Sequence, residues 1–161
     1  MLPTAADTHA LGRALGAAAP PGSWLLIGGD LGVGKTTLIR GVAAGMGAEG
    51  SVTSPTFVLV HEHPCPEPPQ REQGQLLRPR GLVHADLYRV KSGLEAEQLA
   101  LAEYADDGWV VAVEWPERWP AMGEDGALRL SLSGSGDGPR VLLVHAMAEW
   151  AAAAIASVRQ R

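Results

Sequence analysis

The sequence has one cysteine, no long hydrophobic run and no excess of positive charge, and each absence excludes a class of protein. Because Cys65 has no second cysteine to pair with, an internal disulfide is impossible, and this composition is typical of a reducing compartment. Cys65 also lies in a proline-rich stretch, which argues against a catalytic thiol. No apolar segment approaches the roughly 20 residues of a membrane-spanning helix. Residues 1–4 lack the charged start of a secretory signal, so the sequence predicts a cytoplasmic protein with no membrane partner.

Charge and size indicate a single soluble domain. The net charge is −5, which argues against a broad basic surface that would hold nucleic acid without help. The chain has 161 residues, of which 46% are hydrophobic and 19% charged, so it can bury a core and has an ordinary globular composition. We therefore expect one domain over residues 1–161, with any RNA held mainly by a partner.

A glycine-rich segment lies between an apolar run, 24–27, and a stretch with apolar residues at helical spacing, 38–46. Glycines let successive backbone N–H groups converge on one anion, and a following helix adds its free amides and positive dipole end. A strand, a glycine-rich loop and a helix in this order predict a site for a nucleoside triphosphate. The segment matches the phosphate-binding pattern G-x-x-x-x-G-K-[ST] in Gly29, Asp30, Leu31, Gly32, Val33, Gly34, Lys35 and Thr36.

Three consecutive residues at the end of this loop have distinct expected roles. Lys35 supplies a point charge for the β- and γ-phosphates, and the Thr36 hydroxyl is the expected Mg²⁺ ligand. Thr37 is placed to hydrogen-bond the α-phosphate. The expected cofactors are thus a nucleoside triphosphate and Mg²⁺.

Two acidic residues and a tryptophan follow strand-like segments and are further candidates. Glu114 ends the apolar run 109–113, where a carboxylate commonly completes a Mg²⁺ site in P-loop enzymes; the alternative is a solvated strand end. Asp86 follows the run 82–85; it either positions the attacking water or contacts Mg²⁺ through water, and the alternative is a helix or turn cap. Trp115 lies either against the nucleotide base or in the core, and His84 is expected to be packed or hydrogen-bonded rather than catalytic.

The hydrophobic pattern predicts an α/β, P-loop NTPase-like sandwich whose sheet mixes parallel and antiparallel strands. Asp7 or Thr8 is expected to cap the first helix. The strand at 128–132 alternates and suits an antiparallel pair with one wet face. The expected helices are 8–18, 35–46, 94–105 and 148–158, and the expected strands are 23–27, 56–60, 82–85, 109–113, 128–132 and 140–145.

Two segments between the expected elements stand apart in composition. Residues 63–80 are rich in proline and charge, which predicts a surface insertion without fixed structure. Thr53, Ser54 and Thr56 resemble a loop that senses the γ-phosphate, although the same residues also suit an ordinary turn into a strand. His61 and His63 are not spaced as a metal pair with other ligands nearby.

In addition to the loop at 29–37, four short blocks follow a family pattern in chain order: Thr8-x-x-Leu11-Gly12-x-x-Leu15, Ser54-Pro55-Thr56-Phe57, His84-x-Asp86-x-Tyr88-Arg89 and Glu114-Trp115-Pro116-Glu117. Together they resemble the bacterial TsaE (YjeE) family, the ATPases of tRNA threonylcarbamoyladenosine biosynthesis. The insertion at 63–80 is longer than the family pattern, and histidines rather than a tyrosine follow Val60.

This resemblance implies roles for individual residues and for partners. It implies that ATP and Mg²⁺ are the cofactors, that Thr36 and Glu114 bind the ion, and that Asp86, with Lys35, serves hydrolysis. Thr8 and Trp115 are implied to approach the nucleotide. It further implies a complex with TsaD and TsaB, in which ATP turnover supports repeated threonylcarbamoyl transfer to a tRNA adenosine next to the anticodon. The chain itself is then expected to contact tRNA only indirectly, through this complex.

Two other functions suit a P-loop domain of this size. A small-molecule kinase needs an acceptor pocket and usually an arginine-bearing lid, whereas the arginines available here lie in the insertion at 63–80, without a helical pattern. A nucleotide-gated binding module would use ATP to set its affinity for a partner, with the segment at 53–56 as its switch. The sequence does not separate ATP hydrolysis from ATP-gated binding as the functional output.

Overall fold

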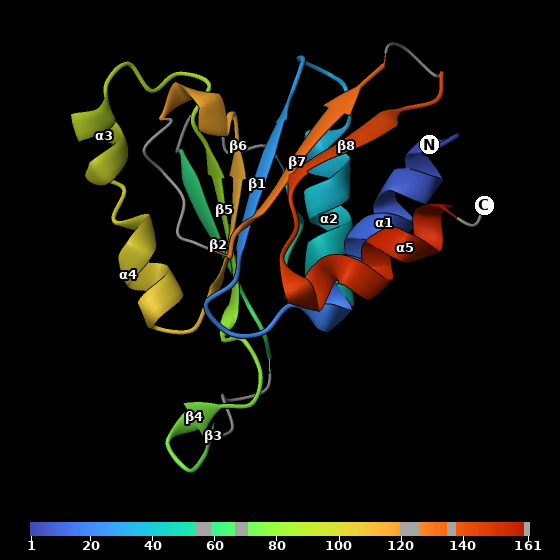
Figure 1. The fold of residues 1–161 in the computed structure, drawn as a ribbon. Helices are drawn as coiled ribbons and strands as arrows, with labels where there is room; N and C mark the ends of the chain where they lie inside the picture. The colour runs from blue at the N-terminus through green and yellow to red at the C-terminus, as the bar shows by residue number, and fades with distance from the viewer. Residues whose placement is uncertain (54–58, 67–70, 120–125, 135–137, 160–161) are drawn as a thin grey trace.

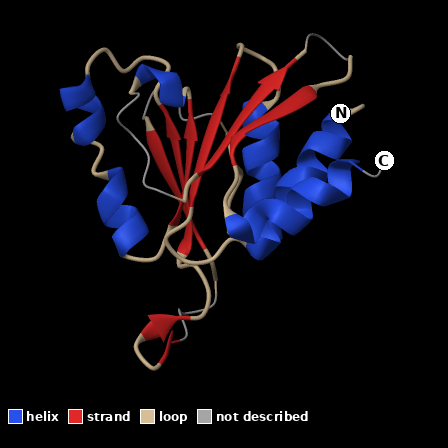
Figure 2. Cartoon of the chain, in the orientation of Figure 1, coloured by secondary structure: helices blue, strands red, loops and turns tan. Residues whose placement is uncertain are grey.

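The computed structural model describes residues 1–53, 59–66, 71–119, 126–134 and 138–159 of the chain, with side chains described up to residue 157. A six-stranded sheet with the strand order β2-β5-β6-β1-β7-β8 forms the centre of the fold (Figures 1 and 2). Its strands are β1 (Trp24–Gly29), β2 (Val60–Pro64), β5 (Gly81–Asp86), β6 (Val110–Glu114), β7 (Leu128–Ser133) and β8 (Val141–Ala146).

The sheet mixes both strand directions, as predicted. The four inner strands β5, β6, β1 and β7 are parallel to one another, and the outer strands β2 and β8 run antiparallel to β5 and β7. The strand expected at 128–132 is β7. It runs antiparallel to β8, as expected, and parallel to its other neighbour, β1. Because parallel strands end at one edge of a sheet, the carboxyl ends of β1, β5 and β6 lie together.

Helices cover both faces of the sheet (Figure 1). One apolar cluster lies between the sheet and the helices α1, α2 and α5, and the other lies on the face of α3 and α4. The α-helices are α1 (Ala5–Ala18), α2 (Lys35–Met46), α3 (Gly93–Glu97), α4 (Leu101–Asp106) and α5 (Ala152–Arg159), and the 3₁₀ turns are η1 (Pro116–Arg118) and η2 (Glu149–Ala151). In the part of the chain that the structure describes, no helix combines the length and apolarity needed to cross a membrane.

Helix α1 packs directly on α2 through glycines. A Cβ atom on Gly16 would collide with the carbonyl of Val42, and one on Gly12 would collide with the carbonyl of Leu38. This close approach fixes α2, which follows the phosphate-binding loop, against the rest of the domain. The predicted helix at 35–46 is confirmed; it ends at Met46 and is capped by Gly47, whose φ is 72°.

The predicted cap of α1 is wrong. The N-cap is Thr4, whose side chain accepts a hydrogen bond from Asp7 N at 3.2 Å. Asp7 in turn accepts from Thr4 N at 3.0 Å, so the two residues form a capping box. Asp7 therefore lies inside the first turn, and Thr8 is buried one residue further along.

Two other segments differ from the sequence prediction. The single helix expected at 94–105 is two short helices, because Ala100 has a φ of 52° and interrupts the helical backbone between α3 and α4. In the insertion at 63–80, His63 and Pro64 continue β2, and Arg71–Glu72 (β3) pairs with Gln75–Leu76 (β4). The prediction of no fixed structure is therefore wrong for these residues.

Backbone hydrogen bonds attach the insertion to the domain. Cys65 N donates to Arg80 O at 2.9 Å, and Arg80 N donates to Gly108 O at 3.1 Å. The Arg80 guanidinium also lies 3.3 Å from the Asp107 carboxylate. Leu76 packs against Gly108, where a Cβ atom would collide with its side chain. The hairpin is thus held next to the turn that follows α4.

Candidate functional site

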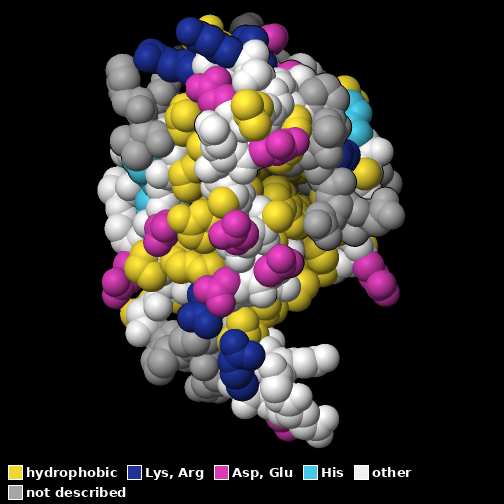
Figure 3. Space-filling view, turned by 90° about the vertical axis from the view of Figure 1, so that its left-hand side faces the viewer, with side chains coloured by type: hydrophobic (Ala, Val, Ile, Leu, Met, Phe, Trp, Pro, Cys, Tyr) yellow, Lys and Arg dark blue, Asp and Glu magenta, His cyan; other side chains and the backbone are white. Residues whose placement is uncertain are grey.

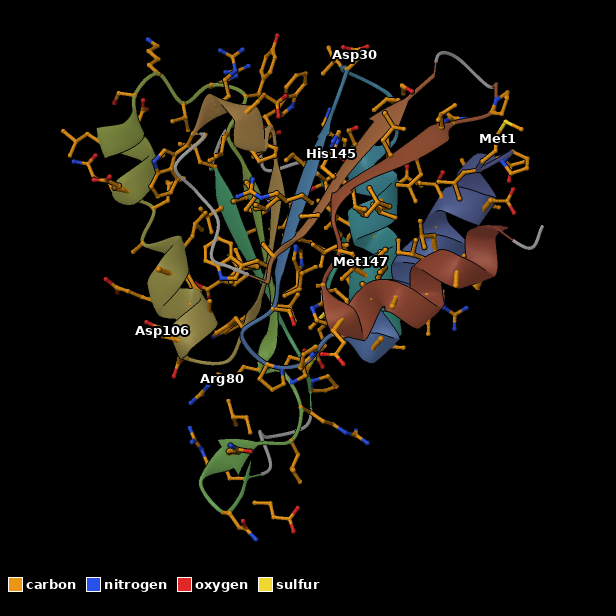
Figure 4. All side chains as sticks on the ribbon, in the orientation of Figure 1. Met1, Asp30, Arg80, Asp106, His145 and Met147 are labelled. Atoms are coloured by element: carbon orange, nitrogen blue, oxygen red, sulfur yellow. The ribbon has the colours of Figure 1, made fainter. Side chains whose placement is uncertain are left out.

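The loop between β1 and α2 lies at the carboxyl edge of the parallel strands. Asp30 marks the point where the chain leaves β1, at the top of the sheet in Figure 4. Gly29 has a φ of 123° and its missing Cβ would collide with the carbonyl of Leu132, so a side chain is excluded there. Gly34, with a φ of 110°, caps α2. The free N–H groups of the first turn of α2 follow directly, which is the arrangement that binds phosphate.

Lys35 is buried and its ammonium group has protein partners. Nζ donates to the carbonyls of Gly29 at 2.6 Å and Asp30 at 2.8 Å, and it lies 3.9 Å from the centroid of the Trp115 ring. Burial lowers the pKa of Lys35 below its ordinary 10.5, and the nearby carboxylates, Glu114 first, oppose this shift. The lysine is thus held at the loop, surrounded by acids that favour its charged form.

Glu114 meets Thr36 across the site. It ends β6, is 3% exposed, and lies in register with Ile27 of β1 and Asp86 of β5. Its Oε1 accepts a hydrogen bond from Thr36 Oγ1 at 2.8 Å and one from His84 Nε2 at 2.9 Å. The structure therefore brings together the two residues expected to be the Mg²⁺ ligands, which are 78 positions apart in the chain.

The residues present suit Mg²⁺. A hydroxyl oxygen and a carboxylate oxygen are hard donors, which this ion prefers. Among the described residues, the Glu114 carboxylate has no hydrogen bond beyond the two on Oε1, so its Oε2 is available to an ion. Together with the phosphate oxygens of a nucleotide, Thr36 and Glu114 would supply the usual coordination of Mg²⁺ in nucleotide sites.

Asp86 lies beside Glu114 at the end of β5. It is 4% exposed, and its Oδ1 accepts a hydrogen bond from Tyr88 N at 2.9 Å. The turn-capping role is therefore present in the structure. The role in hydrolysis stays a prediction, which the position of Asp86 in register with Glu114 supports.

Trp115 adopts a left-handed backbone conformation, with a φ of 60°, directly after Glu114. Its ring lies 5.0 Å from the ring of Tyr88, centroid to centroid, and the Arg118 guanidinium lies 5.6 Å from the Tyr88 ring. With the contact to Lys35, these groups form a row at the edge of the site in which two neighbouring rings lie between two cations.

The remaining predicted residues lie on or next to the loop. Leu31 is 78% exposed and Thr37 is half-buried in α2. Thr8 is buried. If Gly34 carried a Cβ atom, that atom would lie 3.9 Å from Thr8 Cγ2, so the start of α1 lies beside the loop. Of the predicted switch segment, Ser54 and Thr56 lie outside the described residues.

Two residues of the site were not assigned a role there from the sequence. Arg140, next to the start of β8, donates from Nε to the carbonyl of Val33 at 3.3 Å and so supports the loop from a position 107 residues away. His84 contacts Glu114, as described above. Neither contact has a local sequence signal, because each depends on which strands pair.

Charged side chains of the two signs are distributed differently on one face of the molecule. Figure 3 views the face of α3 and α4, where Asp and Glu side chains are scattered and Lys and Arg side chains gather mainly at the end that carries the phosphate-binding loop.

The strand order, the glycine-rich loop and the Lys35–Thr36–Glu114 geometry define an α/β protein of the P-loop NTPase-like class. A family model described as "Threonylcarbamoyl adenosine biosynthesis protein TsaE" matches residues 2–141. The chain therefore belongs to the TsaE family. This confirms the resemblance found in its sequence motifs.

Individual relatives agree with this assignment. A Synechocystis protein named tRNA threonylcarbamoyladenosine biosynthesis protein TsaE is 36% identical over 129 residues, covering 75% of this chain and 71% of the relative. Proteins of the same name from Streptomyces coelicolor (43% identity, 66% of each chain) and Bacillus subtilis (33% identity, 88% of this chain and 80% of the relative) also match. The crystal structure of Bacillus subtilis YdiB superposes with a TM-score of 0.68 at 27% identity, covering 97% of this chain and 89% of that one.

Proposed function

We propose that this protein is a Mg²⁺-dependent ATPase that acts in the threonylcarbamoyl modification of a tRNA adenosine next to the anticodon. The observation that carries the proposal is the hydrogen bond between Thr36 and Glu114, 2.8 Å long, beside a buried lysine at a glycine-rich loop. A binding loop needs only the glycines and the lysine. The buried carboxylate at the end of β6 adds what metal-assisted hydrolysis requires.

Each residue has a defined task in this proposal. The loop amides and the first turn of α2 bind the phosphates, and the Lys35 ammonium neutralises their charge. Thr36 and Glu114 would hold Mg²⁺, which when bound stabilises the negative charge that develops on the transferring phosphoryl group. Asp86 is adjacent to Glu114 in the sheet. It accepts a hydrogen bond from the attacking water and so orients it.

The family assignment supports a role beside other proteins. The relatives named above carry tRNA threonylcarbamoyladenosine biosynthesis in their names, and we propose that this chain works with TsaD and TsaB in the cytoplasm. ATP turnover would support repeated transfer by these partners rather than perform the transfer. With a net charge of −5, the chain would meet tRNA through the complex.

The test is ATP hydrolysis by the purified protein, alone and with TsaD and TsaB added. We expect strong stimulation by the pair and loss of ATP binding in Lys35→Ala. Full activity alone, unchanged by the pair, would contradict the role in the complex and favour an independent ATPase or a kinase, to be separated by screening phosphate acceptors. ATP-dependent binding to the pair without turnover would instead support a nucleotide-gated module.

A further inference from the structure

His84 is a fully buried histidine on β5 to which the proposed mechanism gives no task. It is 0% exposed and lies in register with Ala112 of β6, two positions before the pair formed by Asp86 and Glu114. Since side chains alternate between the faces of a strand, His84 shares a face with both acids. Its ring therefore reaches the Glu114 carboxylate from within the protein.

The histidine and Thr36 hold the same oxygen of Glu114. His84 Nε2 lies 2.9 Å and Thr36 Oγ1 2.8 Å from Oε1. An ionised carboxylate oxygen only accepts hydrogen bonds, so Nε2 carries the hydrogen and donates it. Two donors on Oε1 fix the rotation of the carboxylate, and they leave Oε2 without a partner among the described residues.

Stability alone does not explain a histidine at this position. Its second ring nitrogen, Nδ1, is buried and has no hydrogen-bond partner among the described residues. A buried polar atom without a partner costs free energy, and an apolar side chain of similar size would fill the space without that cost. The one hydrogen bond of the ring goes to Glu114, so the contact with the carboxylate is what distinguishes histidine from leucine here.

We propose that His84 is a positioning residue for the Mg²⁺ site, which holds the Glu114 carboxylate so that Oε2 faces the ion. The inference rests on the proposed function, because it assigns the ion to Thr36 and Glu114. Residues that orient a metal ligand typically change metal affinity or activity about 10- to 100-fold when they are removed.

Three variants separate this role from packing. His84→Gln places an amide N–H as many bonds from Cα as Nε2 and keeps the donor to Glu114. His84→Asn keeps polarity, but its amide reaches only as far as Nδ1. His84→Leu keeps bulk and removes the donor. His61→Leu is the matched control, because His61 pairs with His84 across β2 and β5 and has no hydrogen bond to Glu114.

Two properties of each variant are measured. Calorimetry gives the ATP affinity at a series of Mg²⁺ concentrations and in excess chelator, and thermal unfolding of the same samples gives their stability. We expect His84→Leu and His84→Asn to raise the Mg²⁺ concentration at half-saturation about tenfold or more, with ATP affinity in chelator unchanged. We expect His84→Gln to restore the Mg²⁺ dependence and His61→Leu to leave it unaltered. If His84→Leu does not fold, the comparison of Gln with Asn decides.

Three results would overturn the inference. The first is the same Mg²⁺ dependence in the Asn and Gln variants. The second is a shift that follows the loss of thermal stability rather than the presence of the donor. The third is an undiminished effect of His84→Leu when Glu114 is already replaced by Gln, since the histidine would then act by another route. If the unchanged protein shows no Mg²⁺-dependent ATP binding, the proposed function fails together with this inference.

Discussion

Replacing Glu114 by glutamine tests the assignment of the metal site most directly. Glu114→Gln keeps the shape of the side chain and an oxygen that accepts from Thr36 and His84, and it removes only the negative charge. Because the residue is 3% exposed, water does not screen that charge appreciably, and its loss is felt in full at the site.

The expected effect is on turnover rather than on nucleotide affinity. Removing a group that stabilises charge in a transition state typically costs about 3 kcal/mol in the barrier, which is roughly a hundredfold in rate. ATP affinity in excess chelator should stay the same or rise, because the phosphates no longer meet this carboxylate. Folding stability is measured in parallel, because the buried Lys35 ammonium loses the carboxylate that most favours its charged form.

The rate of ATP hydrolysis is measured as phosphate release at saturating ATP and Mg²⁺. The assay is run with or without TsaD and TsaB, whichever gives the unchanged protein its higher activity. Glu117→Gln is the control, because Glu117 is exposed and also raises the pKa of Lys35, yet among the described residues it has no hydrogen bond to Thr36. If Glu114→Gln hydrolyses ATP at the original rate, Glu114 is not a metal ligand. An equal loss in Glu117→Gln would mean that general charge around the lysine, not ligation, determines the rate.

Three further predictions concern stability and the site. Burial, aided by neighbouring histidines, lowers the pKa of His63 below 6.5, so its contribution to stability is complete above pH 6.5 and is lost as the pH falls through the lowered pKa. His63→Leu should flatten this acid-side decline in chemical unfolding, and an unchanged slope would refute the assignment. Gly16→Ala should destabilise the protein by about 1–3 kcal/mol through its clash with the Val42 carbonyl, measured by urea unfolding against a substitution at an exposed α1 position. Lys35→Ala should change the tryptophan fluorescence, because the ammonium lies 3.9 Å from the centroid of the Trp115 ring, and Trp115→Phe should abolish that change. Persistence of the change in the double variant would place its source in another tryptophan.

Local patterns in the sequence were enough to predict much of this site. The loop at 29–36 and the acid at the end of β6 are signalled by neighbouring residues, since glycines, a following helix and a buried strand leave compositional traces. The mixed sheet followed from continuous apolar runs and one alternating strand. By contrast, the cap of α1 was misplaced by a few residues, because several residues near its start carry a side chain able to cap.

What the sequence could not predict depends on pairing between distant segments. His84 and Glu114 are 30 residues apart and meet because β5 and β6 are adjacent and in register. Arg140 reaches the loop from 107 residues away. Ala100 breaks a helix although alanine is the best helix former, so helix propensity does not predict the break; Ala96 and Leu101 on either side of it are both buried in the apolar cluster on this face of the sheet.

The electrostatics of the site imply that ATP and Mg²⁺ bind as a pair in the proposed function. Glu114 is the strongest of the carboxylates that favour the charged form of Lys35, and the same carboxylate is the proposed ion ligand. Mg²⁺ alone would place two positive charges beside the buried ammonium, and ATP alone would place its phosphates beside Glu114 and Asp86. The phosphates of ATP reduce the repulsion between Mg²⁺ and the Lys35 ammonium, and Mg²⁺ reduces the repulsion between the phosphates and the carboxylates. Bound ATP therefore raises the affinity for Mg²⁺ by the same factor as bound Mg²⁺ raises the affinity for ATP. Loss of the Glu114 charge weakens the coupling from both directions, which is why Glu114→Gln should separate ATP affinity from Mg²⁺ dependence.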